Sequence, residues 1–195
     1  EWTEEFATTI DNFAWFGLLF MFELETYVLD ESMEKKSVRW SVHGLRLVCY
    51  MFLAHTVYAR VNAMVDVFAV QPSPEITSLC QLADQEISFG SNYRYEIVDS
   101  GNCETLSHDS VFFMLEPSVV TDRAGFRLEE KHVYVDFQDV IMWLLVVWAI
   151  ELTVWLQNRN ITGGTLMLVG YAARAGYVVL LAHAAFWLWV GHWVW

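Results

Sequence analysis

A run of apolar residues from 140 to 156, VIMWLLVVWAIELTVWL, most constrains what this chain can fold into. It contains a single charged residue, Glu151. About 20 apolar residues in a helix cross the hydrocarbon core of a bilayer, which is about 30 Å thick. Further apolar stretches occupy residues 15–29, 42–65 and 165–195. We therefore predict an all-α integral membrane protein with four transmembrane helices.

The apolar segments repeat one another at an offset of 128 positions. Eight of the 55 residue pairs between 9–63 and 137–191 are identical. The matches include residues that are costly to place in lipid. These matches are Asp11 with Asp139, Glu23 with Glu151, Arg46 with Arg174, and His55 with His183. We interpret the pattern as two copies of one helical hairpin in the same orientation, related by an axis along the membrane normal.

Residues 66–136 differ in composition from the segments on either side. All three prolines lie here, together with 13 acidic and 4 basic residues. The segment 86–98 predicts two strands around a Gly-Ser-Asn turn, and SVFFML and KHVYVDF also predict strands. The expected organisation is a first hairpin at 1–65, a β-rich extramembrane insert at 66–136 and a second hairpin at 137–195.

Three cysteines have different expected roles. Cys80 and Cys103 both lie in the insert and predict a disulfide if that side of the membrane is oxidising, with two free thiols as the alternative. Cys49 lies in the second apolar segment and is most simply a small buried residue.

Basic residues indicate the orientation of the chain. The two short turns, 30–41 and 157–164, contain Lys35, Lys36, Arg39 and Arg159. The positive-inside rule places these turns in the cytoplasm and the insert on the extracytoplasmic side. The formal net charge of −13 argues against a nucleic-acid partner, which requires a basic surface. The expected partners are the lipid bilayer and other membrane subunits or further copies of the chain.

The repeated charges predict contacts across each hairpin. Two residues of an antiparallel hairpin lie at the same height when their residue numbers add up to a constant, which is about 70 for the first hairpin. On that basis Glu23 lies level with Arg46, and Glu151 with Arg174. Asp11 has Arg60 as a possible partner, whereas the corresponding position near Asp139 is Leu188.

The two histidines are expected level with Trp15 and Trp143, near the middle of the membrane. His55 and His183 each follow their arginine by nine residues, about half a turn of rotation around the helix. If the arginines face their own hairpin partner, the histidines face away from it.

These residues have two interpretations. The acid–arginine pairs either neutralise each other and fix the register of each hairpin, or they form a polar pathway together with Asp11, Asp139 and the histidines. The histidines themselves could be hydrogen-bonded core residues, axial ligands of a haem b, metal ligands together with Glu23 and Glu151, or proton relays.

The sequence therefore favours a channel- or transporter-type membrane protein, or a subunit of one, that moves ions or protons. The alternatives are a non-catalytic assembly subunit and a redox subunit with haem between His55 and His183. The chain lacks phosphate-binding glycine motifs, C-x-x-C and H-E-x-x-H. No catalytic residue is predicted, and an enzyme is the less favoured class.

Overall fold

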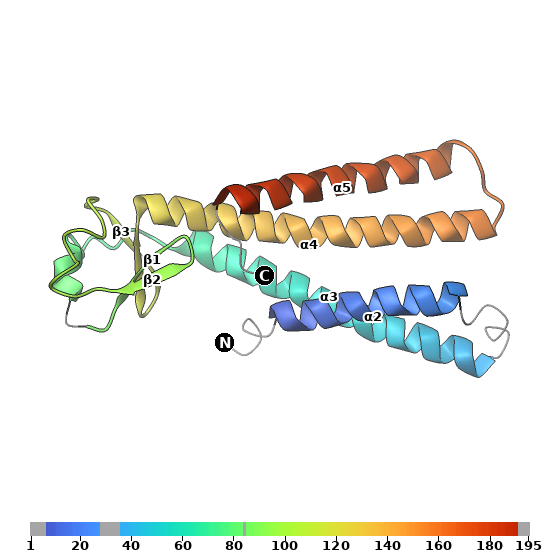
Figure 1. The fold of residues 1–195 in the computed structure, drawn as a ribbon, viewed down its shortest axis with the longest axis horizontal. Coiled ribbons are helices and arrows are strands. Elements are labelled where there is room, and N and C mark those ends of the chain that lie inside the picture. The colour runs from blue at the N-terminus through green and yellow to red at the C-terminus, as the bar shows by residue number, and fades with distance from the viewer. Residues whose placement is uncertain (1–6, 28–35, 84, 191–195) are drawn as a thin grey trace. The chain divides into compact units, whose positions relative to one another are not determined.

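The computed structural model describes residues 7–27, 36–83 and 85–190. Four long helices account for most of them: α2 (Ala7–Tyr27), α3 (Lys36–Ala69), α4 (Arg123–Asn158) and α5 (Gly164–Val190) (Figure 1). A small sheet lies between α3 and α4 in the sequence. The chain divides into two compact units, residues 1–62 and 63–195, and each is described by itself.

The first unit contains α2 and most of α3. Gly17 of α2 lies against Cys49 of α3, and a Cβ added at Gly17 would lie only 2.9 Å from the cysteine sulfur. Leu18 and Leu53 are both 1% exposed. The absence of a side chain at Gly17 therefore allows close helix approach. Cys49 is a buried free cysteine, as predicted.

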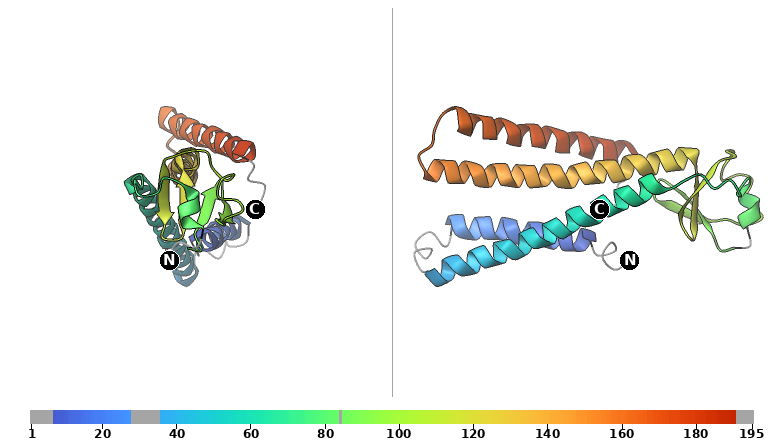
Figure 2. Two further views of the ribbon diagram at one scale, coloured as in Figure 1. Left: turned by 90° about the vertical axis from the view of Figure 1, so that its left-hand side faces the viewer. Right: turned by 180° about the vertical axis from the view of Figure 1, so that it is seen from behind.

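In the second unit, α4 and α5 run side by side as a hairpin (Figure 1, Figure 2). Gly176 of α5 faces Val146 of α4, and a Cβ at Gly176 would lie 2.9 Å from the valine side chain. Towards the connecting turn, Ala149 and Leu156 of α4 pack with Val169 of α5 in a buried apolar cluster. The predicted turn at 157–164 is confirmed, because α4 ends at Asn158 and α5 begins at Gly164.

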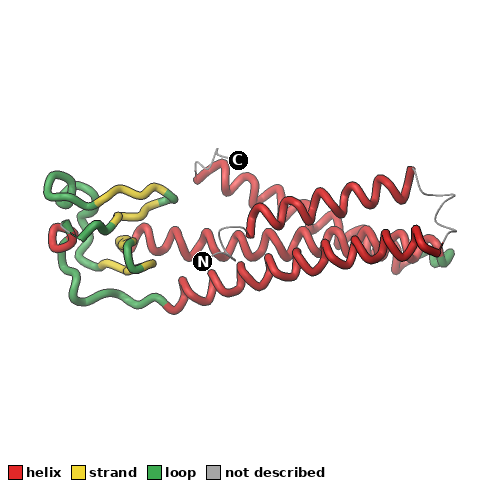
Figure 3. The backbone as a smooth tube through the Cα atoms, turned by 90° about the horizontal axis from the view of Figure 1, so that it is seen from below, coloured by secondary structure: helices red, strands yellow, loops and turns green. Residues whose placement is uncertain are grey.

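A four-stranded sheet lies at the N-terminal end of α4 (Figure 3). Its strands are β1 (Ser88–Ser91), β2 (Arg94–Ile97), β3 (Phe112–Glu116) and β4 (Val119–Asp122), in the order β2-β1-β4-β3. β1 pairs antiparallel with β2 and parallel with β4. The hairpin predicted within 86–98 and the strand predicted from SVFFML are therefore confirmed, but the predicted Gly-Ser-Asn turn is not, because Gly90 and Ser91 belong to β1.

The turn between β1 and β2 consists of Asn92 and Tyr93. Their φ angles are 53° and 60°, so both residues are in the left-handed region. Two consecutive left-handed residues define a type I′ turn, whose twist matches that of a two-residue hairpin. Asparagine tolerates this conformation, but tyrosine at the second position is unusual.

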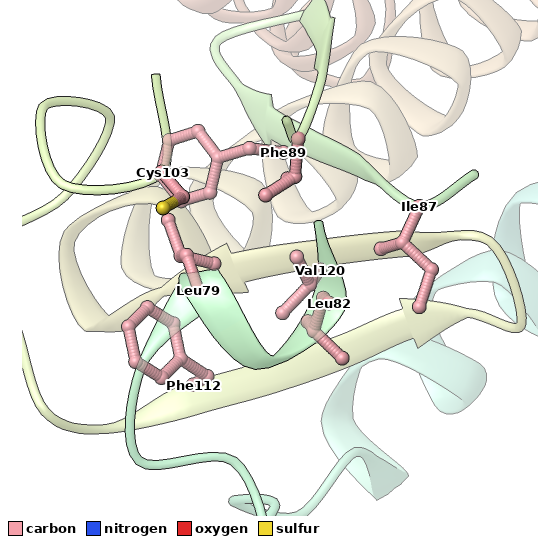
Figure 4. Close-up of a cluster of buried hydrophobic side chains, with 8 residues drawn as sticks. Leu79, Leu82, Ile87, Phe89, Cys103, Phe112 and Val120 are labelled. Carbon is pink, nitrogen blue, oxygen red and sulfur yellow. The ribbon is translucent and has the colours of Figure 1, made fainter. Parts of the chain in front are cut away.

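One face of the sheet covers a compact apolar core (Figure 4). Phe89 and Val120 of the sheet pack there with Leu79 and Leu82, which belong to the short 3-10 helix η2 (Leu79–Leu82). Cys103 is part of the core and forms the predicted disulfide with Cys80. The core is small, so the crosslink makes an important contribution to the stability of the domain. It acts mainly by restricting the unfolded state.

The N-terminus of α4 covers the opposite face of the sheet. The rings of Phe113 and Phe126 stack with centroids 4.2 Å apart. Asp122 caps α4 by accepting a hydrogen bond from the backbone N–H of Gly125 at 2.8 Å. Ser107 in turn donates its hydroxyl proton to the second oxygen of Asp122 at 2.7 Å. These contacts attach the sheet firmly to the helix.

The prediction of a strand from KHVYVDF was wrong. Residues 131–137 lie within α4, which begins at Arg123 rather than near Phe137. The segment alternates polar and apolar residues and contains β-branched valines, a pattern typical of strands. The cap at Asp122 and the packing of Phe126 on the sheet start a helix upstream, and that helix continues through the segment.

Among the described residues, two helices are long and apolar enough to cross a membrane, within Arg123–Gln157 and Gly164–Val190. The four predicted spans are therefore supported only for the second hairpin. α3 falls short by composition because His43, Arg46, His55 and Arg60 lie within it.

Candidate functional site

A partly exposed aspartate of α4 and a buried histidine of α5 form a polar pair. Nδ1 of His183 lies 3.1 Å from Oδ1 of Asp139. The side chain of His183 is 9% exposed and that of Asp139 is 35% exposed. When Asp139 is ionised its carboxylate only accepts, so the hydrogen bond is then donated by Nδ1 of His183, and Nε2 is the ring nitrogen that does not face Asp139.

The pair lies at the end of the long apolar run that is nearest the sheet, not in the middle of the run. Asp139 lies seven residues before Val146, and His183 lies seven residues after Gly176. The two residues are therefore level in the antiparallel hairpin, just outside residues 140–156. The predicted alignment of His183 with Trp143 near mid-membrane was wrong by about one helical turn.

The predicted orientation of the second-copy arginine and histidine also requires correction. His183 faces α4, whereas the exposed Arg174 lies with Cζ 5.6 Å from the ring centroid of Tyr171 on its own helix. The expected ion pair between Glu151 and Arg174 is not observed among the described residues. Glu151 is half-buried in α4.

Comparison of the buried faces explains this rotation. α3 buries Val42, Cys49, Leu53 and Thr56, and α5 buries Val169, Gly176, Leu180 and His183. The two sets have the same spacing but are 127 positions apart, not 128. One residue corresponds to about 100° around a helix. Thr56, rather than His55, therefore occupies the position that His183 has in α5.

The first hairpin contains the remaining candidates from the sequence. Asp11, Arg46, His55 and Arg60 are all half-buried. Asp11 lies six residues before Gly17, and His55 six residues after Cys49, so the two are level, as Asp139 and His183 are. Nδ1 of His55 is buried and has no hydrogen-bond partner in the described part of the chain. The side chain of Glu23 lies outside what the structure describes, as does Lys35.

Sequence reasoning missed three ionisable residues on the face of α4 that carries Asp139. Glu129, His132 and Asp136 precede it at steps of three, four and three residues. Such spacing places all four side chains along one side of a helix. We refer to Glu129, His132, Asp136 and Asp139 as the polar face of α4. The segment KHVYVDF overlaps this face and alternates polar and apolar residues as a strand does. That alternation masks the helical spacing of the ionisable residues.

His132 is enclosed by aromatic side chains and is 0% exposed. Its ring stacks on Tyr93 with centroids 4.6 Å apart and an interplanar angle of 12°. Trp187 of α5 lies 5.3 Å from it, and Phe186 approaches at 6.3 Å. Nδ1 of His132 lies 3.5 Å from Oε2 of Glu129, whose side chain is 27% exposed. Glu129 is therefore a partly exposed ionisable group close to this enclosed imidazole, but no hydrogen bond joins the two side chains among the described residues.

The β1–β2 turn holds the outer ends of both helices. While Tyr93 stacks on His132 of α4, Asn92 donates an amide hydrogen bond to the carbonyl of Val190 in α5 at 2.9 Å. Tyr95 of β2 lies near Glu129, and burial, followed by the charges of Glu129 and Glu116, raises the pKa of Tyr95 above its usual value. The β1–β2 turn therefore contacts both α4 and α5 at the end of the hairpin nearest the sheet.

The polar face ends at Asp139. The next residues of α4 that face α5 are apolar: Val146 and Ala149 are 1% and 0% exposed. Towards the 157–164 turn lies the apolar cluster around Leu156 and Val169. The described α4–α5 packing is thus polar near the sheet and apolar at Val146, Ala149 and Leu156, with Glu151 half-buried between the last two.

A resident metal ion receives no support from the described residues, among which no group of three His, Cys, Asp or Glu side chains converges. For the haem alternative, Nε2 of His183 is the nitrogen available for ligation, because Nδ1 contacts Asp139. No family model, curated protein or solved structure matches the chain.

Proposed function

We propose that this protein is a membrane-embedded subunit that translocates ions or protons, with two repeated hairpins in the bilayer and the disulfide-containing sheet on the extracytoplasmic side. The observation that carries the proposal is the Asp139–His183 pair at 3.1 Å, in which His183 is buried and Asp139 is partly exposed at the sheet end of the apolar run. Ionisable groups inside membrane helices are costly and commonly mark ion or proton routes. Deleting one partner of a buried pair leaves the other charge uncompensated.

The buried residues of α3 and α5 have the same spacing but at an offset of 127, one position from the 128 of the repeated charges. The two helices therefore share a packing pattern without sharing the placement of those charges. Large apolar side chains that face away from the helix contacts are compatible with lipid on both hairpins. Examples are Phe13 at 75%, Phe16 at 70%, Leu168 at 69% and Leu181 at 71% exposed. The polar face covers only the part of α4 nearest the sheet, so a complete route needs further residues beyond Asp139.

Flux through liposomes that contain the purified protein tests this function. We expect proton or alkali-cation flux above that of protein-free liposomes, and a loss of at least about tenfold in Asp139→Asn and His183→Gln, because general acid–base groups typically contribute about 100-fold or more. His108→Gln is the matched control, since His108 is an exposed residue of the insert. Absence of flux in the wild-type protein, or unchanged flux in both variants, would overturn the proposal.

An assembly subunit is the second candidate, and the incomplete polar route is the observation that favours it. In that case the Asp139–His183 pair fixes the register of the hairpin, and the acidic insert binds a partner. The purified chain would then conduct nothing, and both variants would lower the melting temperature without any transport phenotype.

A further inference from the structure

We propose that the translocated species is the proton, and that Glu129, His132 and Asp136 deliver it to the Asp139–His183 pair from the side of the sheet. This inference rests on the proposed function and specifies its substrate, its entry side and three further residues. It starts from the regular placement of four ionisable groups on one face of α4.

The spacing of the polar face suits transfer in short steps. Successive residues are separated by about 4.5, 6 and 4.5 Å along the helix axis, at 1.5 Å per residue. Carboxylate and imidazole side chains can bridge such separations directly or through one water molecule. At the first step Glu129 Oε2 lies 3.5 Å from His132 Nδ1, so a small shift of Glu129 or one water molecule completes the contact. The last step is the 3.1 Å contact between Asp139 and His183.

The surroundings of His132 favour a proton over a hydrated cation. The imidazole is fully buried, and the rings of Tyr93, Phe186 and Trp187 pack around it. The titratable groups near it are Glu129 and Asp136 on the same face of its own helix, and Tyr93 from the β1–β2 turn. Phe186 and Trp187 of α5 carry no titratable group. A hydrated cation needs space that these rings occupy, whereas a proton moves by exchange between neighbouring atoms.

The chemistry of each step is balanced and involves no change of oxidation state. Glu129 takes a proton from water and passes it to Nδ1 of His132, which becomes an imidazolium as the glutamate becomes a carboxylate. The imidazolium loses a proton towards Asp136, and the neutral carboxyl of Asp136 passes a proton to the Asp139–His183 pair. Because the proton enters His132 at Nδ1 and leaves from Nε2, the ring returns to its starting tautomer by rotation or by exchange with water before another transfer begins. The Asp139–His183 pair likewise releases its proton to the next acceptor.

The test is a stopped-flow measurement of proton entry into proteoliposomes that contain a trapped pH indicator. Glu129→Gln and His132→Phe should each slow entry by at least tenfold. Glu130→Gln is the matched control, because it removes a carboxylate from the neighbouring position of the same helix and should leave entry unchanged. Glu129 lies at the half-exposed end of the face, so its variant should preserve folding even if His132→Phe does not.

A second measurement separates the relay from the proposed function. The ¹⁵N NMR signal of His183 should still respond to pH in Glu129→Gln but with slower exchange, and it should change position in Asp139→Asn. If Glu129→Gln and His132→Phe conduct protons at the wild-type rate while Asp139→Asn does not, the relay is wrong and the proposed function stands. Selective flux of an alkali cation would overturn the proton assignment. No flux in the wild-type protein would overturn both.

Discussion

Asp109 shows how a single surface residue can affect pH stability outside the helices. Its Oδ1 accepts a hydrogen bond from the backbone N–H of Ser110 at 2.8 Å and another from Val111 at 3.3 Å. The bond from Ser110 contributes most to lowering the pKa of Asp109, and the charge of Arg123 acts in the same direction. A carboxyl with a lowered pKa in the folded state stabilises that state above its unfolded pKa of about 3.9.

We therefore expect Asp109→Ala to reduce the melting temperature at pH 7, and the difference from wild type to shrink as the pH falls through the lowered pKa of the folded carboxyl. The reason is that a protonated Asp109 no longer favours the folded state. Thermal unfolding between pH 7 and pH 3 provides the measurement. A difference that stays constant over this range would show that the ionised carboxylate is not the stabilising form.

His183 illustrates a second residue-scale point, the effect of one position of helix rotation. The sequence repeat equates His55 with His183, yet the buried faces equate Thr56 with His183. A rotation of about 100° separates the two alignments. This rotation places His183 next to Asp139 and leaves Arg174 exposed, and no pattern in the sequence specifies it.

The β1–β2 hairpin is the element that closes the outer end of α4 and α5. Tyr93 occupies a left-handed conformation with φ of 60°, which costs a non-glycine residue about 1–2 kcal/mol. The compensation is its stacking on His132. Glu86 is also left-handed, with φ of 52°, but it is exposed. The two positions therefore allow a controlled comparison.

We expect Tyr93→Gly to destabilise the protein although it relieves backbone strain, because loss of the ring uncovers His132. Glu86→Gly should be neutral or stabilising by up to about 1 kcal/mol. Hydrogen exchange of the amides near His132 and Val190 should accelerate in the first variant only. Equal stabilisation by both glycines would mean that Tyr93 contributes nothing to holding the helices.

At this scale the sequence predicted some elements correctly and missed others for identifiable reasons. The β1–β2 hairpin, β3 and the Cys80–Cys103 disulfide follow from local patterns of turn residues, alternation and cysteine location. The first part of α4 does not, because KHVYVDF has the local pattern of a strand and becomes helical through capping and packing upstream. The polar face of α4 was hidden by the same error.

The orientation of the whole molecule in the membrane remains a prediction from the positive-inside rule. Lys36 and Arg39 lie in the first turn of α3, and Arg159 follows α4. On this basis the turn at 157–164 is cytoplasmic and the sheet extracytoplasmic.

Sided labelling checks this orientation. A membrane-impermeant maleimide applied to intact cells should modify Ser118→Cys in the β3–β4 turn. It should modify Thr162→Cys only after the membrane is permeabilised. Both positions are exposed, and the buried Cys49 provides a low background. Labelling of Thr162→Cys in intact cells would reverse the orientation and move the entry side of the proposed proton route.

The continuity of α4 has a mechanical consequence. The helix runs without a break from the sheet-bound Phe126 through Asp139 to Asn158. No break in the helix separates the part that contacts the sheet from the apolar part. A rotation of the sheet would therefore be passed along α4. Because the sheet also holds α5 through the Asn92–Val190 hydrogen bond, a molecule that twisted the sheet would act on both helices that supply the Asp139–His183 pair.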